Sequence, residues 1–219
     1  MSDINVLVER ARAQIAKLRG GYTPALRDVR KALSAGLRAT PARDVVAIGF
    51  ALASDTPRWI GYELITKHRG ARKSLTIRDV ERLGRGKLDS WYAVDAFGIY
   101  ISGPAWRDGQ IAEADVKRWA RSKDLWWRRA ALVSTVPLNA KSGGNGFRTK
   151  ETLAIATLLI DDREDMVVKA LSWALRVLAA RDPKAVRQFL GQHADRLAAR
   201  VKRETHRKIT TGKKNYPKR

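Results

Sequence analysis

Hydrophobic side chains recur every three or four residues along almost the whole chain. In residues 4–18 they fall on one stripe, with Arg and Lys opposite, and the stripe consists of Val6, Leu7, Ala11, Ile15 and Leu18. This spacing is typical of an amphipathic helix that packs one face against a core. No segment shows the alternation of period two that indicates a half-buried strand. The pattern predicts an all-α protein.

Capping signals divide the pattern into about a dozen short helices. A Ser, Thr or Asp followed by Pro, which is typical of a helix start, occurs at Thr23-Pro24, Thr40-Pro41, Thr56-Pro57 and Asp182-Pro183. The predicted helices cover 4–18, a segment from 23, then 41–54, 59–68, 76–83, 91–102, 109–121, 125–136, 149–161 and 164–180, and a last helical region runs from 183 to about 203. The glycine-rich stretch within 139–147 predicts a flexible loop.

A weak internal repeat organises these helices. Trp59, Trp91 and Trp127 are each predicted to open the second helix of a pair, with spacings of 32 and 36 residues, and Met166 opens a fourth copy. Helix pairs at this period indicate a HEAT-like α-solenoid of about six antiparallel pairs with a concave basic groove. The alternative is an irregular helical bundle. We expect one domain over 1–207 and a basic, disordered tail over 208–219.

The charge balance points to a polyanionic partner. Lys and Arg total 44 against 22 Asp and Glu, which gives a formal net charge of +22. Repulsion among so many positive charges opposes folding, so the excess indicates that the protein binds a polyanion. Nucleic acid is the first candidate partner, and an anionic membrane surface is the second. One basic cluster follows the helix at 59–68 and consists of Lys67, Arg69, Arg72 and Lys73.

Several classes of site and location are excluded or disfavoured. The chain has no cysteine, so it has no disulfide, thiolate metal site or cysteine nucleophile. His68, His193 and His206 lie too far apart to suggest a metal site. No apolar stretch is long enough to span a bilayer, and the first residues lack a signal-peptide pattern. We expect a soluble, cytoplasmic protein.

Candidate chemistry lies on three successive helices. Trp91 and Asp95 are four residues apart and share one helix face, where a carboxylate needs either a salt-bridge partner or an open groove. Arg128 and Arg129 follow a Trp pair on the next such helix, where the alternative is cation–π packing. A third helix carries one stripe that consists of Lys169, Trp173 and Arg176. This stripe either contacts phosphates or simply covers the protein surface.

In order and spacing, the segments 91–95, 125–132 and 169–176 resemble the AlkD-type DNA alkylation repair family, whose members are HEAT-like-repeat DNA glycosylases. The resemblance implies that Asp95 is the catalytic carboxylate, that Trp91 and Trp173 are its aromatic neighbours, and that Arg129 contacts the DNA backbone. Tyr92 departs from the family, which often has an acidic residue there.

The implied function is the excision of cationic N-alkylated purines, such as 3-methyladenine and 7-methylguanine, from double-stranded DNA in base excision repair. We expect a monomer that needs no cofactor and associates with the nucleoid when bound to DNA. The DNA-binding set also includes Trp127, Arg128, Lys141, Arg148, Lys169 and Arg176. Two alternatives are a non-catalytic protein that binds DNA or RNA structures and, less favoured, a protein-interaction scaffold.

Overall fold

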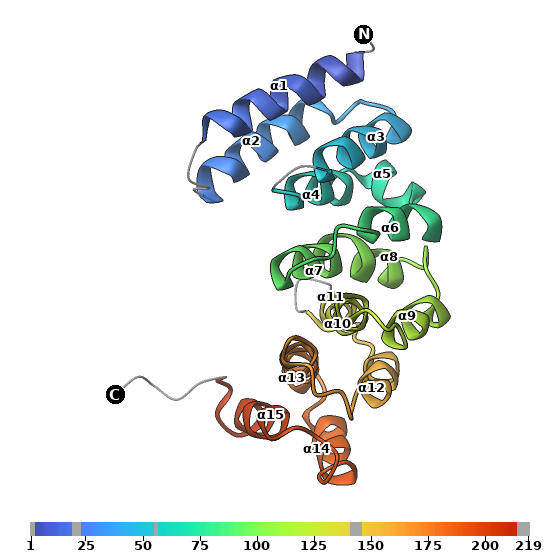
Figure 1. Cartoon of the computed structure of the whole chain (residues 1–219), viewed down its shortest axis with the longest axis vertical. Helices are drawn as coiled ribbons and strands as arrows, with labels where there is room; N and C mark the ends of the chain where they lie inside the picture. The colour runs from blue at the N-terminus through green and yellow to red at the C-terminus, as the bar shows by residue number, and fades with distance from the viewer. Residues whose placement is uncertain (1–2, 19–22, 55–56, 141–145, 214–219) are drawn as a thin grey trace. The chain divides into compact units, whose positions relative to one another are not determined.

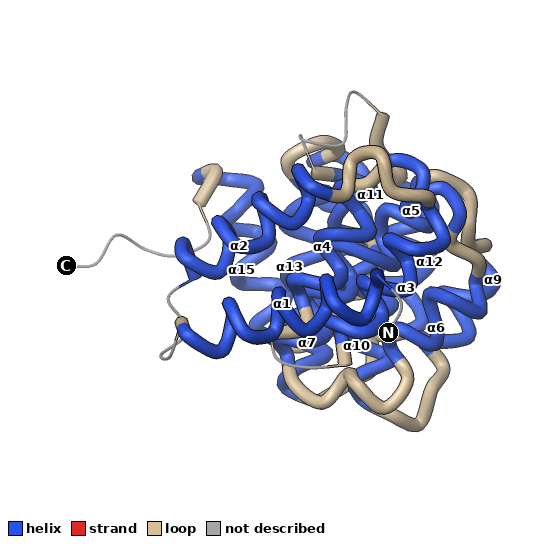
Figure 2. The backbone as a smooth tube through the Cα atoms, turned by 90° about the horizontal axis from the view of Figure 1, so that it is seen from above, coloured by secondary structure: helices blue, strands red, loops and turns tan. Residues whose placement is uncertain are grey.

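The computed structural model describes residues 3–18, 23–54, 57–140 and 146–213 (Figure 1). These residues form helices and connecting loops, and no strand occurs among them (Figure 2). The predicted all-α class is therefore confirmed. The chain divides into two compact units, Met1–Lys87 and Leu88–Arg219, where we expected one domain over 1–207. That the two act as one domain stays a prediction.

The first unit is a short stack of helix pairs. Its helices are α1 (Asp3–Lys17), α2 (Thr23–Gly36), α3 (Ala42–Ala53), α4 (Trp59–Lys67), α5 (Arg69–Ser74) and α6 (Ile77–Gly84). Helix α1 packs against α2 and α3, while α4 packs against α2 and α3. The buried face of α4 carries Ile60, Tyr62 and Ile65. The Tyr62 hydroxyl donates to the Leu83 carbonyl at 2.9 Å and so links α4 to α6.

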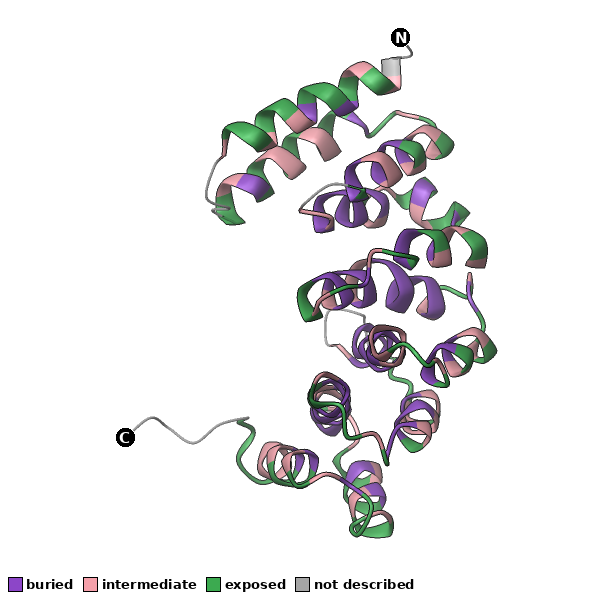
Figure 3. Ribbon diagram, viewed as in Figure 1, coloured by how far each residue is buried: buried purple, intermediate pink, exposed green. Residues whose placement is uncertain are grey.

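The second unit continues the same kind of stacking. Its elements are α7 (Trp91–Phe97), the π-helical turn η1 (Gly98–Ser102), α8 (Gly103–Arg107), α9 (Glu113–Ala120), α10 (Leu125–Ser134), α11 (Val136–Asn139), α12 (Thr149–Leu158), α13 (Asp165–Ala179), α14 (Pro183–Gln192) and α15 (Ala199–Thr211). Helix α10 packs against α7, α9 and α13, and α13 packs against α12, α14 and α15. Helices α7, α10, α13 and α15 thus follow one another along one side of this unit, and their mutual contacts are buried (Figure 3). This is the packing of an all-α solenoid, as predicted.

The residues that define the predicted repeat lie at or near the starts of helices. Trp59 and Trp91 are the first residues of α4 and α7, Trp127 lies in the first turn of α10, and Met166 lies in the first turn of α13. The pattern therefore located the starts of these four helices to within two residues.

The predicted end of the 91–102 helix was wrong. The helical segment passes through the π-helical turn and ends at Arg107. Gly98 and Gly103 within it allow close contact with the next helices. A Cβ atom on Gly98 would lie 2.4 Å from Val133 Cγ1, and one on Gly103 would lie 2.6 Å from Pro137 Cγ. Side chains at these positions would push α7 and α8 away from α10 and α11.

The predicted C-terminal tail also needs correction at its start. The last predicted helical region, 183–203, contains α14 and the start of α15, and α15 continues to Thr211, so residues 208–211 are helical. Val201 and Thr205 are buried, and this packing stabilises the extended helix. Gly212 ends it with a left-handed backbone (φ 71°). Residues 214–219 lie outside the described residues.

The ends of the predicted 139–147 loop are held by one side chain. Asn139 is buried, and its amide donates to the Thr135 carbonyl at 3.0 Å and to Thr152 Oγ1 at 2.8 Å. Its side-chain oxygen accepts from the backbone N–H of Arg148 at 3.0 Å. Residues 141–145, which include Lys141, lie outside the described residues. In the described part of the chain, no helix is long and apolar enough to cross a membrane.

Candidate functional site

One cavity of about 420 Å³ in the second unit collects most of the residues singled out from the sequence. Helices α7, α10, α13 and α15 line it with Trp91, Asp95, Arg129, Met166, Lys169, Trp173, Arg176, Arg200 and Glu204. Its volume lies within the range of pockets that hold small organic groups. The three expected catalytic residues and three of the expected DNA-binding residues therefore meet at one place.

Asp95 is positioned by its own helix and by an arginine from the next one. The Ser90 hydroxyl caps α7 by accepting from the Ala93 N–H at 3.3 Å, so Trp91 is the first helical residue and Asp95 follows one turn later. Nε and Nη2 of Arg129 both donate to Asp95 Oδ1, at 3.1 and 2.7 Å. Nη1 of Arg129 donates to the Met166 carbonyl, which ties the guanidinium to α13 as well.

Two opposing effects act on the pKa of the Asp95 carboxyl group. Burial raises the pKa of the carboxyl group above its ordinary value, while the charge and hydrogen bonds of Arg129 lower it. Burial is the larger effect, although 21% of the side chain stays exposed to the cavity. Both Arg129 bonds go to Oδ1, so Oδ2 has no hydrogen bond to this arginine.

The two tryptophans of the cavity differ in exposure. Trp91 is 55% exposed, which is unusual for a side chain of this size, and its ring meets that of Tyr92 edge to face at 6.2 Å. Trp173 is half-buried on α13. An exposed aromatic face beside a carboxylate is suited to contact with a cationic group.

The remaining cations of the cavity are paired with acidic residues. Asp165 pairs with Lys169 at 2.6 Å and with Arg200 at 3.3 Å, and all three side chains are well exposed. Arg176 is buried and pairs with Glu204 at 2.5 Å, while Glu204 also accepts from the Ser172 hydroxyl at 2.8 Å. Burial lowers the pKa of Arg176, and the charge of Glu204 opposes this effect. The exposed pairs are therefore the ones that can exchange partners at low cost.

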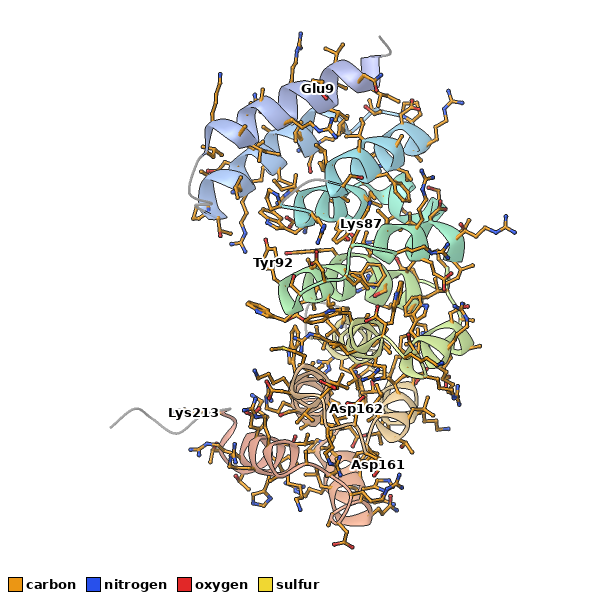
Figure 4. All side chains as sticks on the ribbon, viewed as in Figure 1. Glu9, Lys87, Tyr92, Asp161, Asp162 and Lys213 are labelled. Atoms are coloured by element: carbon orange, nitrogen blue, oxygen red, sulfur yellow. The ribbon has the colours of Figure 1, made fainter. Side chains whose placement is uncertain are left out.

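Of the four other expected DNA-binding residues, three are described, and these three lie away from the cavity. The ring of Trp127 packs against Phe97 at 5.9 Å and Trp119 at 5.3 Å in an aromatic cluster. Arg128 pairs with Asp162, which lies between α12 and α13 (Figure 4), and this ion pair joins consecutive helix pairs. Arg148 is half-exposed and pairs with Glu151 at 2.9 Å. Lys141 is outside the described residues, so none of the four enters the proposal below.

Sequence reasoning missed Arg200 and Glu204. Both lie on α15, four residues apart, and Glu204 lies just beyond the predicted end of the last helical region at about residue 203. A lone acidic residue within a strongly basic helix was the signal that could have identified Glu204. Within the described ranges, no group of three or more His, Asp or Glu side chains could hold a metal ion.

The comparison with protein families agrees with this arrangement. No curated protein and no solved structure gives a significant match to the chain. A family model described as DNA alkylation repair enzyme matches residues 10–209. The match includes every residue of the cavity and covers nearly the whole chain. The chain therefore belongs to the DNA alkylation repair enzyme family.

Proposed function

We propose that this protein is a DNA glycosylase that removes cationic N-alkylated purines, such as 3-methyladenine and 7-methylguanine, from double-stranded DNA. The observation that carries the proposal is the position of Asp95, a carboxylate on the same cavity as Trp91 and Trp173. The cationic cavity suits a polyanionic backbone, while the carboxylate and the ring faces suit a cationic base.

Asp95 acts on the charge that develops in the reaction. Alkylation gives the purine a positive charge, and cleavage of its bond to C1′ moves the bonding electrons onto the base and leaves an oxocarbenium-like sugar. A fixed carboxylate stabilises that positive charge. Water then adds to C1′ and loses a proton, which Asp95 Oδ2 accepts. The products are the free purine and an abasic site in an intact strand.

Arg129 is a positioning residue in this proposal. The sequence suggested that it contacts the DNA backbone, but only 5% of it is exposed and Asp95 and Met166 engage its guanidinium. It fixes the direction of the Asp95 carboxylate. Contact with the backbone falls to Lys169 and Arg200, whose exposed pairing with Asp165 contributes little to stability and can be exchanged for phosphate.

Release of the free base from a defined lesion tests the proposal. The purified chain is incubated with a duplex that contains one 7-methylguanine, and both the released base and the alkali-sensitive abasic sites are measured over time. We expect equal amounts of both, and none from the unmodified duplex. Tight binding to the duplex without base release would contradict the proposal and favour the non-catalytic DNA-binding protein.

A further inference from the structure

We infer that the first unit carries its own phosphate-binding site for a nucleic-acid backbone, formed by Arg38, Lys67 and Arg69. These residues line a cavity of about 610 Å³ in that unit, whereas the Asp95 cavity lies wholly in the second unit. The inference rests on DNA as the partner in the proposed function, but not on the excision chemistry.

The chain brings the three cations together from two separate segments. Arg38 follows the end of α2, Lys67 is the last residue of α4 and Arg69 is the first residue of α5. The residue between the helices, His68, has an extended backbone (φ −89°, ψ 109°), and its Nδ1 accepts from the Ala71 N–H at 3.0 Å. This cap fixes the bend that places both neighbours of His68 on the same cavity.

The acidic residues beside this cavity are already neutralised. Glu63 pairs with Arg30 at 3.1 Å, with both side chains about nine-tenths buried, and Asp28 pairs with Lys31 at 3.0 Å. In the part of the chain that the structure describes, Arg38, Lys67 and Arg69 have no acidic partner, and all three are exposed. Three uncompensated cations therefore share one cavity.

Uncompensated like charges at one place raise the free energy of the unbound protein. An anion removes this repulsion, and the planar guanidinium groups of two arginines match the oxygen geometry of phosphate. The three cations act as phosphate-binding groups that grip the backbone of the duplex through the first unit.

Salt dependence of duplex binding tests the inference. The full chain and the triple variant Arg38→Gln/Lys67→Gln/Arg69→Gln are titrated into a labelled, undamaged duplex at several salt concentrations. Each lost phosphate contact makes the slope of log Kd against log salt shallower by about 0.9. We expect a change of roughly 0.9 to 2.7, since the three cations can share phosphates.

A matched control removes the same charge elsewhere in the first unit. Arg10, Arg27 and Arg78 are exposed and do not line the cavity, so Arg10→Gln/Arg27→Gln/Arg78→Gln should change the slope less. The charge-preserving Arg38→Lys/Arg69→Lys variant should keep the wild-type slope. Circular dichroism melting confirms folding, and the three single variants replace the triple one if it unfolds.

The result that overturns the inference is a slope for the triple variant equal to that of the control. Loss of binding to anionic phospholipid vesicles with unchanged duplex binding would also overturn it and identify a membrane surface as the partner. Base excision is measured separately at saturating protein. A changed slope in a protein that releases no 7-methylguanine would support this site and contradict the proposed glycosylase.

Discussion

Arg129 holds Asp95 by one carboxylate oxygen across a sequence separation of 34 residues. The pair joins α7 to α10, and the guanidinium continues to the Met166 carbonyl on α13. One side chain therefore couples three of the four helices that line the cavity, at the point where the candidate carboxylate lies. Both bonds of the pair go to Oδ1, so Oδ2 has no hydrogen bond to this arginine.

Loss of the guanidinium should reduce both stability and excision. Arg129→Met leaves the half-buried Asp95 without a partner, and we expect a loss of about 1–3 kcal/mol in the free energy of unfolding. Urea denaturation measures it. Arg128→Met is the matched control, because it breaks the Arg128–Asp162 pair outside the cavity. The control should lose stability and keep its excision rate, whereas equal losses of excision in both variants would contradict the positioning role of Arg129.

Excision should decline in acid at a higher pH than an ordinary aspartate predicts. Burial raises the pKa of Asp95, and the reaction needs its ionised form, so the rate should fall as the pH drops through a value above about 3.9. Arg129 lowers this pKa, so its replacement by Met should move the decline to still higher pH. The other charged groups of the cavity are Lys169, Arg176, Arg200 and Glu204.

Single-turnover rates against pH, corrected for spontaneous base loss without protein, measure this effect.

The raised pKa of Asp95 also affects the free energy of unfolding, but with the opposite dependence on pH from the excision rate. The folded state holds the Asp95 proton more tightly than the unfolded chain, so the contribution of this group to the free energy of unfolding falls as the pH rises through its folded pKa. An acid limb that does not move in Arg129→Met would contradict the link between this pair and catalysis.

Each tryptophan of the cavity should contribute less than Asp95. Trp91→Ala and Trp173→Ala each remove one ring face, and a cation–π contact of about 0.5–2 kcal/mol corresponds to a rate loss of roughly 2- to 30-fold. Trp91→Ala should leave the melting temperature nearly unchanged, because its ring is mostly exposed. Phe147→Ala serves as the control, since Phe147 is also exposed but does not line the cavity. A Phe147 effect as large as that of Trp91 would argue against a specific aromatic contact.

The residues that line the cavity on α7, α10 and α13 were easier to predict from the sequence than the residues around them. Trp91 and Asp95 share a helix face by spacing alone, and the repeat placed Arg129 and Trp173 on the neighbouring helices. Trp127 could not be assigned in the same way. The sequence around a Trp in a basic segment is the same whether the ring packs in the core or binds DNA. The ring contacts with Phe97 and Trp119 show that Trp127 packs against its neighbours.

Other features depend on tertiary contacts that no local pattern reports. The extension of α15 to Thr211 rests on the burial of Val201 and Thr205, and this extension brings Glu204 to the cavity. The π-helical turn after α7 arises where Gly98 lies against Val133. Sequence periodicity gives neither the end of a helix nor the distance between two helices.

Close contact at Gly98 should be essential to the stability of the second unit. Gly98→Ala places a methyl group 2.4 Å from Val133 Cγ1, so α7 and α10 must separate, and we expect a loss of about 1–3 kcal/mol. Gly191→Ala is the control, because no heavy atom lies within 4 Å of the added Cβ and the position is close to the end of α14. It should be neutral or stabilising by up to about 1 kcal/mol. Urea midpoints compare the two, and an equally mild effect at Gly98 would contradict the packing described for this contact.

The role of Asp95 is the central claim. Asp95→Asn keeps the size of the side chain and its hydrogen-bonding capacity but removes the charge that faces the developing oxocarbenium. Loss of one well-placed electrostatic stabiliser costs on the order of 10²–10³ in rate. Duplex affinity should be unchanged or slightly higher, because a negative charge near the phosphates is gone. Asp162→Asn is the control, since it weakens an Arg–Asp ion pair that lies away from the cavity.

The most direct measurement is the single-turnover excision of 7-methylguanine by Asp95→Asn, with melting temperature and duplex affinity determined on the same preparation. We expect a rate reduced on the order of 10²–10³, duplex affinity retained and a stability loss no larger than that of Asp162→Asn. An unchanged excision rate in a folded, DNA-binding Asp95→Asn protein would contradict this expectation.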